Sequence, residues 1–355
     1  MTLMKLGLLM SVTLATVVGC AARPVVRPEG VTIIRSYRFE TTVPDPQPAW
    51  NPSNYLIAAR HAQGLALYQE GAGRQEFFLA ADNRSSYFPT WISRDQFLFS
   101  GPTNATRAAD GRVLNSTDGL TVVGVVDDGR RCNVERHPLS DRGNRPRVAH
   151  DEIYAQTGRS MVVIDRFGAV KDAGEGFWPE PQADGPGIAW QESPVIEPDL
   201  WTGQSPRGRL LVRWKPGVVT PVVGGVQPRW TPAGGLVCTV VRADPPTDRP
   251  WWTPGTDVVY LAGPDAEPVI LARDARDPAP HPKEPLVAVT ARDGGVRLVA
   301  YDTTVPARTL VTKGITPKWS YDGLRILAEE VQPNRPEATL IRVQVLKLTP
   351  TISEK

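Results

Sequence analysis

One short pattern returns along most of this sequence, and it constrains the fold more than any other feature. The pattern is Pro-x-Trp, a turn of about four residues and an apolar run, as in "PKWSYDGLRILAE". The four clear copies begin at Pro48, Pro89, Pro228 and Pro317. Three weaker copies begin at Pro146, Pro179 and Pro278. Successive starting prolines are 41, 57, 33, 49, 50 and 39 residues apart, so a unit of similar size recurs.

A period averaging roughly 45 residues with strand-only content is typical of propeller blades. The chain also holds 35 Pro and 31 Gly, which interrupt helices and favour short strands joined by turns. One such sheet has two apolar faces and needs neighbours, and radial packing of blades supplies them. We therefore predict an all-β, seven-bladed β-propeller over residues 31–348, with six blades as the alternative if the Pro146 copy is irregular.

The last copy indicates how the ring closes. It supplies an inner strand, a second strand and a third over 338–348, and it lacks a fourth. The strand-like segment 31–40, "VTIIRSYRFE", precedes the first copy and has no blade of its own. We expect it to be the outer strand of the last blade.

These repeats resemble those of the TolB-type, WD40-like propeller family, whose unit reads approximately Pro-x-Trp-Ser-Pro-Asp-Gly before a strand. The copy from Pro317 matches through Trp319, Ser320, Asp322 and Gly323, with Tyr321 in place of the second proline. The resemblance covers nearly all of 31–348 and implies contacts with other envelope proteins. TolB also has an N-terminal α/β domain, for which we expect no counterpart here.

The N-terminus resembles a bacterial lipoprotein signal peptide. Lys5 precedes an apolar run of 13 residues, 6–18, which is too short to span a membrane and is followed by Gly19 and Cys20. We expect 1–19 to be removed, Cys20 to carry the lipid with attached palmitate, and 20–30 to act as a stiff tether. Residues 349–355 are expected to form a tail. The residue after Cys20 is Ala21 and not Asp, which favours sorting of the lipoprotein to the outer membrane if the host has one.

Bulk charge and known motifs exclude several function classes. The net charge is +2, and no run of basic residues predicts nucleic-acid binding. The sequence has no Gly-x-Ser-x-Gly, Walker loop, His-Glu-x-x-His or Cys-x-x-Cys, so we expect no enzyme activity and no cofactor. Cys132 and Cys238 could pair in an oxidising compartment, but two buried thiols are the simpler interpretation.

Histidines and acidic turn residues offer alternative sites. The four histidines, in different repeats, are His61, His137, His150 and His281. A metal site would need them to meet across the axis, and solvated turn histidines are the simpler interpretation. The acidic residues in or beside inner turns are Asp95, Asp151, Asp184 and Asp322. They could form an acidic ring, but Asp capping its own turn accounts for them. The repeated Trp50, Trp91, Trp230 and Trp319 are expected to pack between blades.

Three long insertions carry the strongest functional signal. They cover 101–119, 193–209 and 242–257, and each follows a second strand and precedes a third. That connection emerges on one face of every blade, and insertions gathered on one face commonly mark a binding surface. The candidate binding residues are Trp201, Arg249, Trp251 and Trp252, since Trp and Arg are enriched at binding hot spots. Alternatively, these loops fold back and bury their tryptophans.

The sequence therefore predicts a monomeric, membrane-anchored extracytoplasmic lipoprotein. It would act as a protein-binding or scaffold propeller in the cell envelope, with an unidentified envelope protein or polymer as partner. The alternative is an enzyme or saccharide-binding propeller with a site in the central channel, where acids and aromatic residues would converge.

Overall fold

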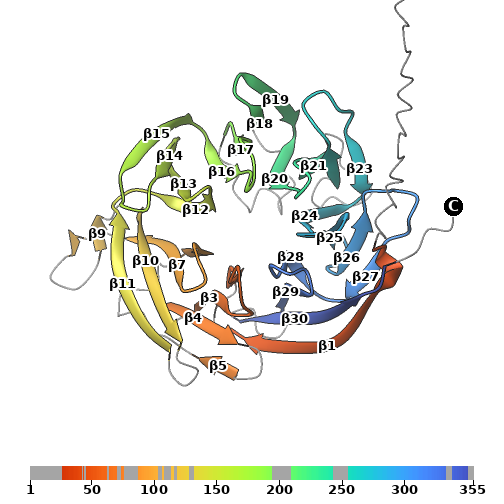
Figure 1. The fold of residues 1–355 in the computed structure, drawn as a ribbon, viewed down its shortest axis with the longest axis horizontal. Helices are drawn as coiled ribbons and strands as arrows, with labels where there is room; N and C mark the ends of the chain where they lie inside the picture. The colour runs from red at the N-terminus through yellow and green to blue at the C-terminus, as the bar shows by residue number, and fades with distance from the viewer. Residues whose placement is uncertain are drawn as a thin grey trace, which may run out of the picture.

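The computed structural model describes residues 26–350, except 42, 44, 62–63, 70–72, 76–86, 103–105, 108–112, 116–117, 128–131, 194–208, 243–254 and 333–337. Within these residues the strands form seven four-stranded antiparallel sheets arranged as a ring (Figure 1). The predicted seven-bladed β-propeller is confirmed. The copy from Pro146, whose regularity was in question, is a complete blade of four strands.

Each blade is numbered here in chain order, and its strands run from the ring axis outward. Blade 1 consists of β2 (Ala49–Trp50), β3 (Ile57–His61), β4 (Gly64–Gln69) and β5 (Gly73–Gln75). Blade 2 consists of β6 (Tyr87–Trp91), β7 (Gln96–Pro102), β10 (Asp118–Asp127) and β11 (Cys132–Ser140). Blade 3 consists of β12 (Asn144–Ala149), β13 (Glu152–Thr157), β14 (Ser160–Ile164) and β15 (Val170–Glu175). Blades 4 and 5 consist of β16 (Phe177–Pro181), β17 (Ile188–Gln191), β18 (Arg209–Lys215) and β19 (Val218–Val223); and β20 (Gly225–Trp230), β21 (Leu236–Val241), β22 (Thr256–Leu261) and β23 (Val269–Ala272). Blades 6 and 7 consist of β24 (Ala275–Pro280), β25 (Leu286–Ala291), β26 (Val296–Ala300) and β27 (Arg308–Val311); and β28 (Ile315–Trp319), β29 (Arg325–Val331), β30 (Thr339–Leu348) and β1 (Val31–Glu40).

The ring closes through β1, as expected. This strand pairs antiparallel with β30, from Val31 opposite Leu348 to Glu40 opposite Leu340. Figure 1 shows β1, in red and orange, running along β30, in blue. The hydroxyl of Thr41 also donates to the carbonyl oxygen of Thr339 at 2.7 Å, which extends the closure beyond the strand.

Residues 26–30, the last part of the segment expected to act as a stiff tether, lie directly before β1. Val26 is 3% exposed and belongs to the apolar cluster between blades 6 and 7, and Pro28 is also buried. A short 3-10 turn, η1 (Pro28–Gly30), follows, and the guanidinium of Arg308 donates to the carbonyl oxygen of Glu29 at 2.9 Å. Residues 26–30 are thus packed on the ring, because Val26 and Pro28 bury apolar surface there.

The core lies between blades, where facing sheets bury their apolar residues. For example, Leu98 and Leu120 of blade 2 share a cluster with Ile153 and Ile164 of blade 3. The repeated tryptophans reinforce these joints, as predicted. Their indole N–H groups donate to backbone carbonyls of the preceding blade: Trp50 to Lys318 at 3.0 Å, Trp91 to Ala49 at 3.0 Å, Trp230 to Glu180 at 2.9 Å and Trp319 to Ala279 at 2.9 Å. Cys238 is a free thiol, fully buried in β21, and burial raises its pKa to about 12.

Strand direction divides the ring into two faces. On the entry face the inner strands begin, and on the turn face a hairpin joins each inner strand to its second strand. Since second strands run back, their connections to third strands emerge on the entry face. The three insertions leave there, after β7, β17 and β21, as predicted. The first of them contains a short hairpin, β8 (Thr106–Arg107) and β9 (Val113–Asn115). Among the described residues, no helix is long and apolar enough to cross a membrane.

Candidate functional site

All seven inner strands share an unusual backbone feature at their start. The residue before the repeat proline has a positive φ in every blade: Gln47 46°, Phe88 54°, Arg145 51°, Trp178 53°, Gln227 51°, Asp277 50° and Thr316 53°. Residues before proline are normally extended, and left-handed non-glycine residues are costly, so the surrounding structure must hold them. In blades 2 to 7 the pairing register shifts at this point, which indicates a β-bulge.

Neighbouring side chains support the bulge by accepting its backbone N–H. The Phe88 N–H donates to Oε1 of Gln47 at 2.8 Å, and the Asp277 N–H donates to Oε1 of Gln227 at 3.1 Å. In blade 7 the acceptor for the Thr316 N–H is the hydroxyl of Thr290, at 3.0 Å. Because polar groups of adjacent repeats fulfil this role, the bulge is a built feature of the ring.

The repeat prolines also limit the kind of ligand contact that the inner strands can make at the ring axis. An inner strand is a sheet edge, and an edge can normally pair with an added strand. Proline has no N–H to donate, so the repeat proline within six inner strands, and directly before β2 in the seventh, interrupts such pairing. Recognition at the axis must therefore depend on side chains.

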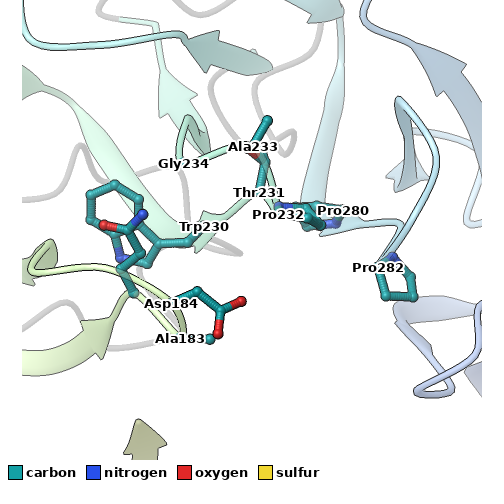
Figure 2. A pocket seen from close by; sticks show the side chains of 10 residues that line it. Ala183, Asp184, Trp230, Thr231, Pro232, Ala233, Gly234, Pro280 and Pro282 are labelled. Carbon is teal, nitrogen blue, oxygen red and sulfur yellow. The ribbon is translucent and has the colours of Figure 1, made fainter. Parts of the chain in front are cut away.

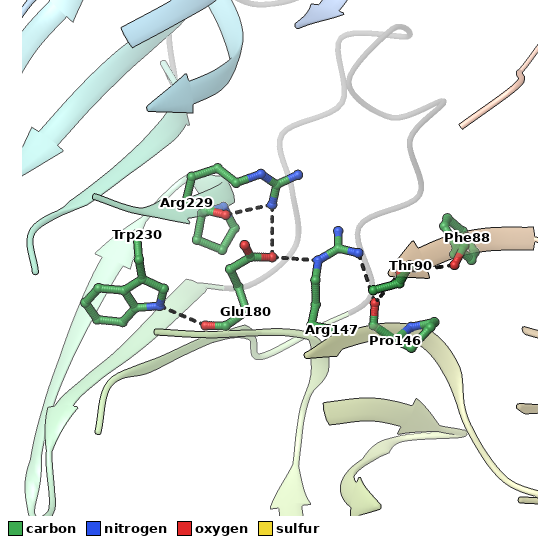
Figure 3. A network of polar contacts seen from close by, with 8 residues as sticks. Phe88, Thr90, Pro146, Arg147, Glu180, Arg229 and Trp230 are labelled. Carbon is green, nitrogen blue, oxygen red and sulfur yellow. Dashed lines mark hydrogen bonds and ion pairs between the residues drawn. The ribbon is translucent and has the colours of Figure 1, made fainter. Parts of the chain in front are cut away.

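The residues that directly follow these prolines form what we call the axial layer. In ring order they are Ala49, Thr90, Arg147, Glu180, Arg229, Ala279 and Lys318. Arg147 Nε donates to Oε2 of Glu180 at 2.8 Å, and Arg229 Nη1 donates to the same oxygen at 3.1 Å (Figure 3). The side chains of Arg147 and Arg229 are 36% and 37% exposed, against 16% for Glu180. Solvent thus reaches both cations, although they are bonded to a carboxylate.

Electrostatics link these cations across the ring. Loss of hydration lowers the pKa of Arg229, and repulsion from Arg147 adds to the effect in spite of Glu180. Loss of hydration also lowers the pKa of Lys318, with further lowering from Arg147 and Arg229. Glu329, on β29, and Asp45 offset part of this repulsion. The Lys318 ammonium donates to the carbonyl oxygen of Pro48 at 2.7 Å. Three cations from blades 3, 5 and 7 therefore share one electrostatic environment.

On the entry face, three of the residues before the prolines form an aromatic and cationic stack. The guanidinium carbon of Arg145 lies 4.1 Å from the ring centroid of Trp178 and 4.6 Å from that of Phe88. All three side chains are half-buried. Cation–π contact on both faces orients Arg145 between blades 2 and 4, on the face from which the insertions leave.

The turn face carries a hollow of about 520 Å³ among the hairpin turns of blades 4, 5 and 6 (Figure 2). Its lining includes the carboxylate of Asp184, the indole of Trp230 and Pro282. Trp230 is tied to the carbonyl of Glu180 through its N–H, so its ring is fixed at this edge. The lining of the hollow thus combines one acid and one aromatic ring.

The histidines and acids proposed as alternative sites serve mainly in turns. His281 is buried and binds turn backbone, and His150 contacts the carbonyl of Gly185 at 2.9 Å. Asp322 accepts from the Ser320 hydroxyl and the Leu324 N–H, as turn capping requires. Asp95 likewise accepts from Ser93. No group of three potential metal ligands occurs within the described residues.

The candidate lipidation residue and the candidate binding residues of the insertions are outside the described residues. These are Cys20, Trp201, Arg249, Trp251 and Trp252. Sequence reasoning did not single out the axial layer. Its signal was present, because the position between Pro and the third repeat residue is charged in "PRV", "PEP", "PRW" and "PKW". Solvent-facing positions of any alternating strand can carry charged residues that have no function. The charge pattern alone therefore did not distinguish the axial layer from an ordinary exposed strand face.

Comparison with known proteins supports the fold alone. The sequence matches no family model and no curated protein. Among solved structures, the streptogramin B lyase has a TM-score of 0.54 at 11% identity, covering 89% of this chain and 98% of that one. The WD40 domain of Pan2 from Neurospora crassa has a TM-score of 0.50 at 12% identity, covering 93% and 100%. The tricorn protease has a TM-score of 0.52 at 11% identity, covering 88% of this chain.

This chain has a WD40-like β-propeller fold. It spans 36% of the tricorn protease chain, so only a part of that enzyme is similar to it. The similar structures include a lyase, a protease and a WD40 domain, and one fold serves all three. Function must therefore be argued from the residues of this propeller.

Proposed function

We propose that this protein is a lipid-anchored, extracytoplasmic β-propeller that binds an envelope protein or polymer through its entry face. The observation that carries the proposal is the placement of the insertions, since all three leave the ring on that face. The signal-like N-terminus with Cys20 supports the location, and the TolB-type resemblance of the repeats supports the kind of partner. The stack of Phe88, Arg145 and Trp178 adds aromatic surface to the same face.

The stems of two insertions are held firmly at the ring. Arg209 forms a two-bonded pair with Glu192, with Nη2 to Oε1 at 2.7 Å and Nε to Oε2 at 3.1 Å. The Arg242 N–H donates to the carbonyl of Gly255 at 2.9 Å across the base of the third insertion. Fixed stems reduce the conformational entropy that an insertion loses on binding.

The test is site-specific photo-crosslinking in intact cells. A crosslinking residue at Trp201 should give a discrete adduct, whereas one at Phe167, which is 79% exposed on the turn face, should give none. The double variant Trp251→Ala/Trp252→Ala should abolish the adduct, losing on the order of 2 kcal/mol or more of binding energy, with an unchanged melting temperature. A large fall in melting temperature with the adduct intact would show that the pair is packing, and the proposal would fail.

One observation favours the alternative, a saccharide-binding propeller. Acidic and aromatic side chains converge in the turn-face hollow, through Asp184 and Trp230 (Figure 2). Calorimetric titration with a set of cell-wall sugars should detect binding, and Asp184→Asn should weaken it. The variant's intact entry face distinguishes this outcome from capture through the insertions.

A further inference from the structure

The axial layer contains more cationic than acidic side chains. Arg147, Arg229 and Lys318 contribute three positive charges, and Glu180 contributes one negative charge. Glu329, Asp45 and Asp277 lie outside this layer and compensate in part, yet loss of hydration keeps the pKa of Lys318 and that of Arg229 below their ordinary values. Like charges held close with reduced hydration destabilise a fold, and a bound anion relieves that cost.

The geometry leaves donors for such an anion. Arg147 uses Nε for Glu180 and Nη1 for the carbonyl of Pro146, and Arg229 uses Nη1 for Glu180 and for the carbonyl of Pro228. A guanidinium carries five N–H donors, so each Arg has more N–H groups than these bonds use. Planar guanidinium forks match carboxylate and phosphate oxygens in two-bonded pairs.

The rest of the layer makes room beside these groups. The neighbours of Lys318 in ring order are Ala279 and Ala49, whose side chains are single methyl groups. Glu180 is the least exposed of the three charged residues in the Arg147–Glu180–Arg229 cluster, so solvent reaches the two cations more readily than the carboxylate. An arriving anion would meet the guanidinium groups before it meets the acid.

The size and class of the ligand follow from the same residues. The repeat prolines oppose strand pairing, so an extended chain would find little backbone support here. The half-buried stack of Arg145 between Phe88 and Trp178 lies at the entry-face end of the same inner strands. These features favour a compact ligand with two or three negative charges.

We propose that Arg147, Arg229 and Lys318 form an axial site that binds a small polyvalent oxyanion, either a di- or tricarboxylate or a phosphate. This site is separate from the insertions and goes beyond the proposed partner binding. Glu180 acts within it as an internal competitor that occupies both guanidinium groups until the ligand arrives.

The site can be tested by calorimetric titration and thermal melting of the purified full chain. Citrate, inorganic phosphate and chloride at matched ionic strength serve as probes. One of the two oxyanions should bind and raise the melting temperature by several degrees, and chloride should not. Whichever oxyanion binds more tightly identifies the source of the ligand group. If neither binds, or if chloride stabilises equally, the proposal is overturned.

Variants with opposite expected signs separate the site from general charge effects. Arg147→Gln/Arg229→Gln should weaken oxyanion binding at least tenfold, whereas Glu180→Gln should strengthen it by releasing both guanidinium groups. Unfolding cannot produce that increase. The matched control is Arg166→Gln/Arg297→Gln, which removes two exposed positive charges away from the axis and should leave affinity unchanged. Equal weakening by both double variants, or no gain in Glu180→Gln, would refute the site. Partner capture by the insertions is read out separately, so either proposal can fail alone.

Discussion

Asn51 and His281 stand at the same place in their repeats, three residues after the proline, and make the same bonds. Oδ1 of Asn51 accepts from the N–H groups of Ser53 and Asn54, while its Nδ2 donates to the carbonyl of Arg94 at 2.6 Å. Two unlike residues thus close their own turn and join it to the turn of another blade.

His281 reproduces this arrangement with an imidazole ring. Nδ1 accepts from the N–H groups of Lys283 and Glu284, and Nε2 lies 3.1 Å from the carbonyl of Gly323, to which it donates. An Nδ1 that accepts two bonds carries no proton, so the ring is neutral. Loss of hydration is the main cause that lowers its pKa to about 4.

This histidine should make stability depend on pH. The unfolded chain takes up the proton near pH 6.5 and the folded chain only near pH 4, so the unfolded state binds more protons between these values. The free energy of unfolding therefore falls as pH drops through this window, by on the order of 3 kcal/mol in full. Thermal melts between pH 7 and pH 5 (roughly the upper part of this window) should show the decline.

Substitutions isolate the contribution of the ring. His281→Asn keeps the bonding pattern seen at Asn51 and cannot titrate, so its melting temperature should vary less with pH than that of the wild type. His281→Ala loses the bonds and should melt lower at every pH. A slope in His281→Asn equal to the wild type would show that other groups cause the pH dependence.

At the scale of elements, β1 holds the ring closed, and its removal should be costly. Deleting 31–40 leaves the outer edge of β30 unpaired and removes Tyr37 and Phe39 from the cluster shared by blades 7 and 1. We expect a loss of several kcal/mol and a less cooperative melt. The matched control is deletion of 21–25, because Val26 and Pro28 are themselves buried. Equal melting of both truncations would contradict the role of β1.

The sequence carried enough information to predict the ring but not its axial chemistry. The Pro-x-Trp repeat predicts blades because the packing of one blade on the next requires a unit of regular length with a bulky residue at each contact between blades. The closing strand follows from counting strands in the last copy. By contrast, the left-handed residue before each proline opposes local preference, and bonds from other blades hold it. Such tertiary support has no local signature.

Two further elements escaped prediction for related reasons. The hairpin of β8 and β9 lies in an insertion whose polar sequence has no strand alternation. Residues 26–30 read as a tether because of their prolines, but burial of Val26 against blade 6 depends on contacts with residues such as Val296 and Leu310, distant in sequence. In both cases the deciding contacts are formed only in the folded ring.

At the scale of the whole molecule, the expected anchor makes a direct prediction. If Cys20 is the acylated residue, labelled palmitate should enter the wild type and be lost in Cys20→Ser, with the unprocessed precursor accumulating. Cys238→Ser offers a control, because that thiol is buried in β21 and cannot be modified in the folded chain. Equal labelling of wild type and Cys20→Ser would exclude this anchor.

Closure through β1 has a consequence for how the molecule is made. β1 is the first strand to be synthesised, and it cannot pair until β30, the last strand, has been made. Thr41 and Thr339, which bond at this closure, are 298 positions apart in sequence. At about 5–20 residues per second, that wait lasts roughly 15 to 60 seconds. During this interval β1 has no partner strand in its own chain, and β1 of a neighbouring nascent chain is unpaired as well. We therefore expect a chain that ends before β30 to aggregate more readily than the full chain, because its β1 has no partner strand.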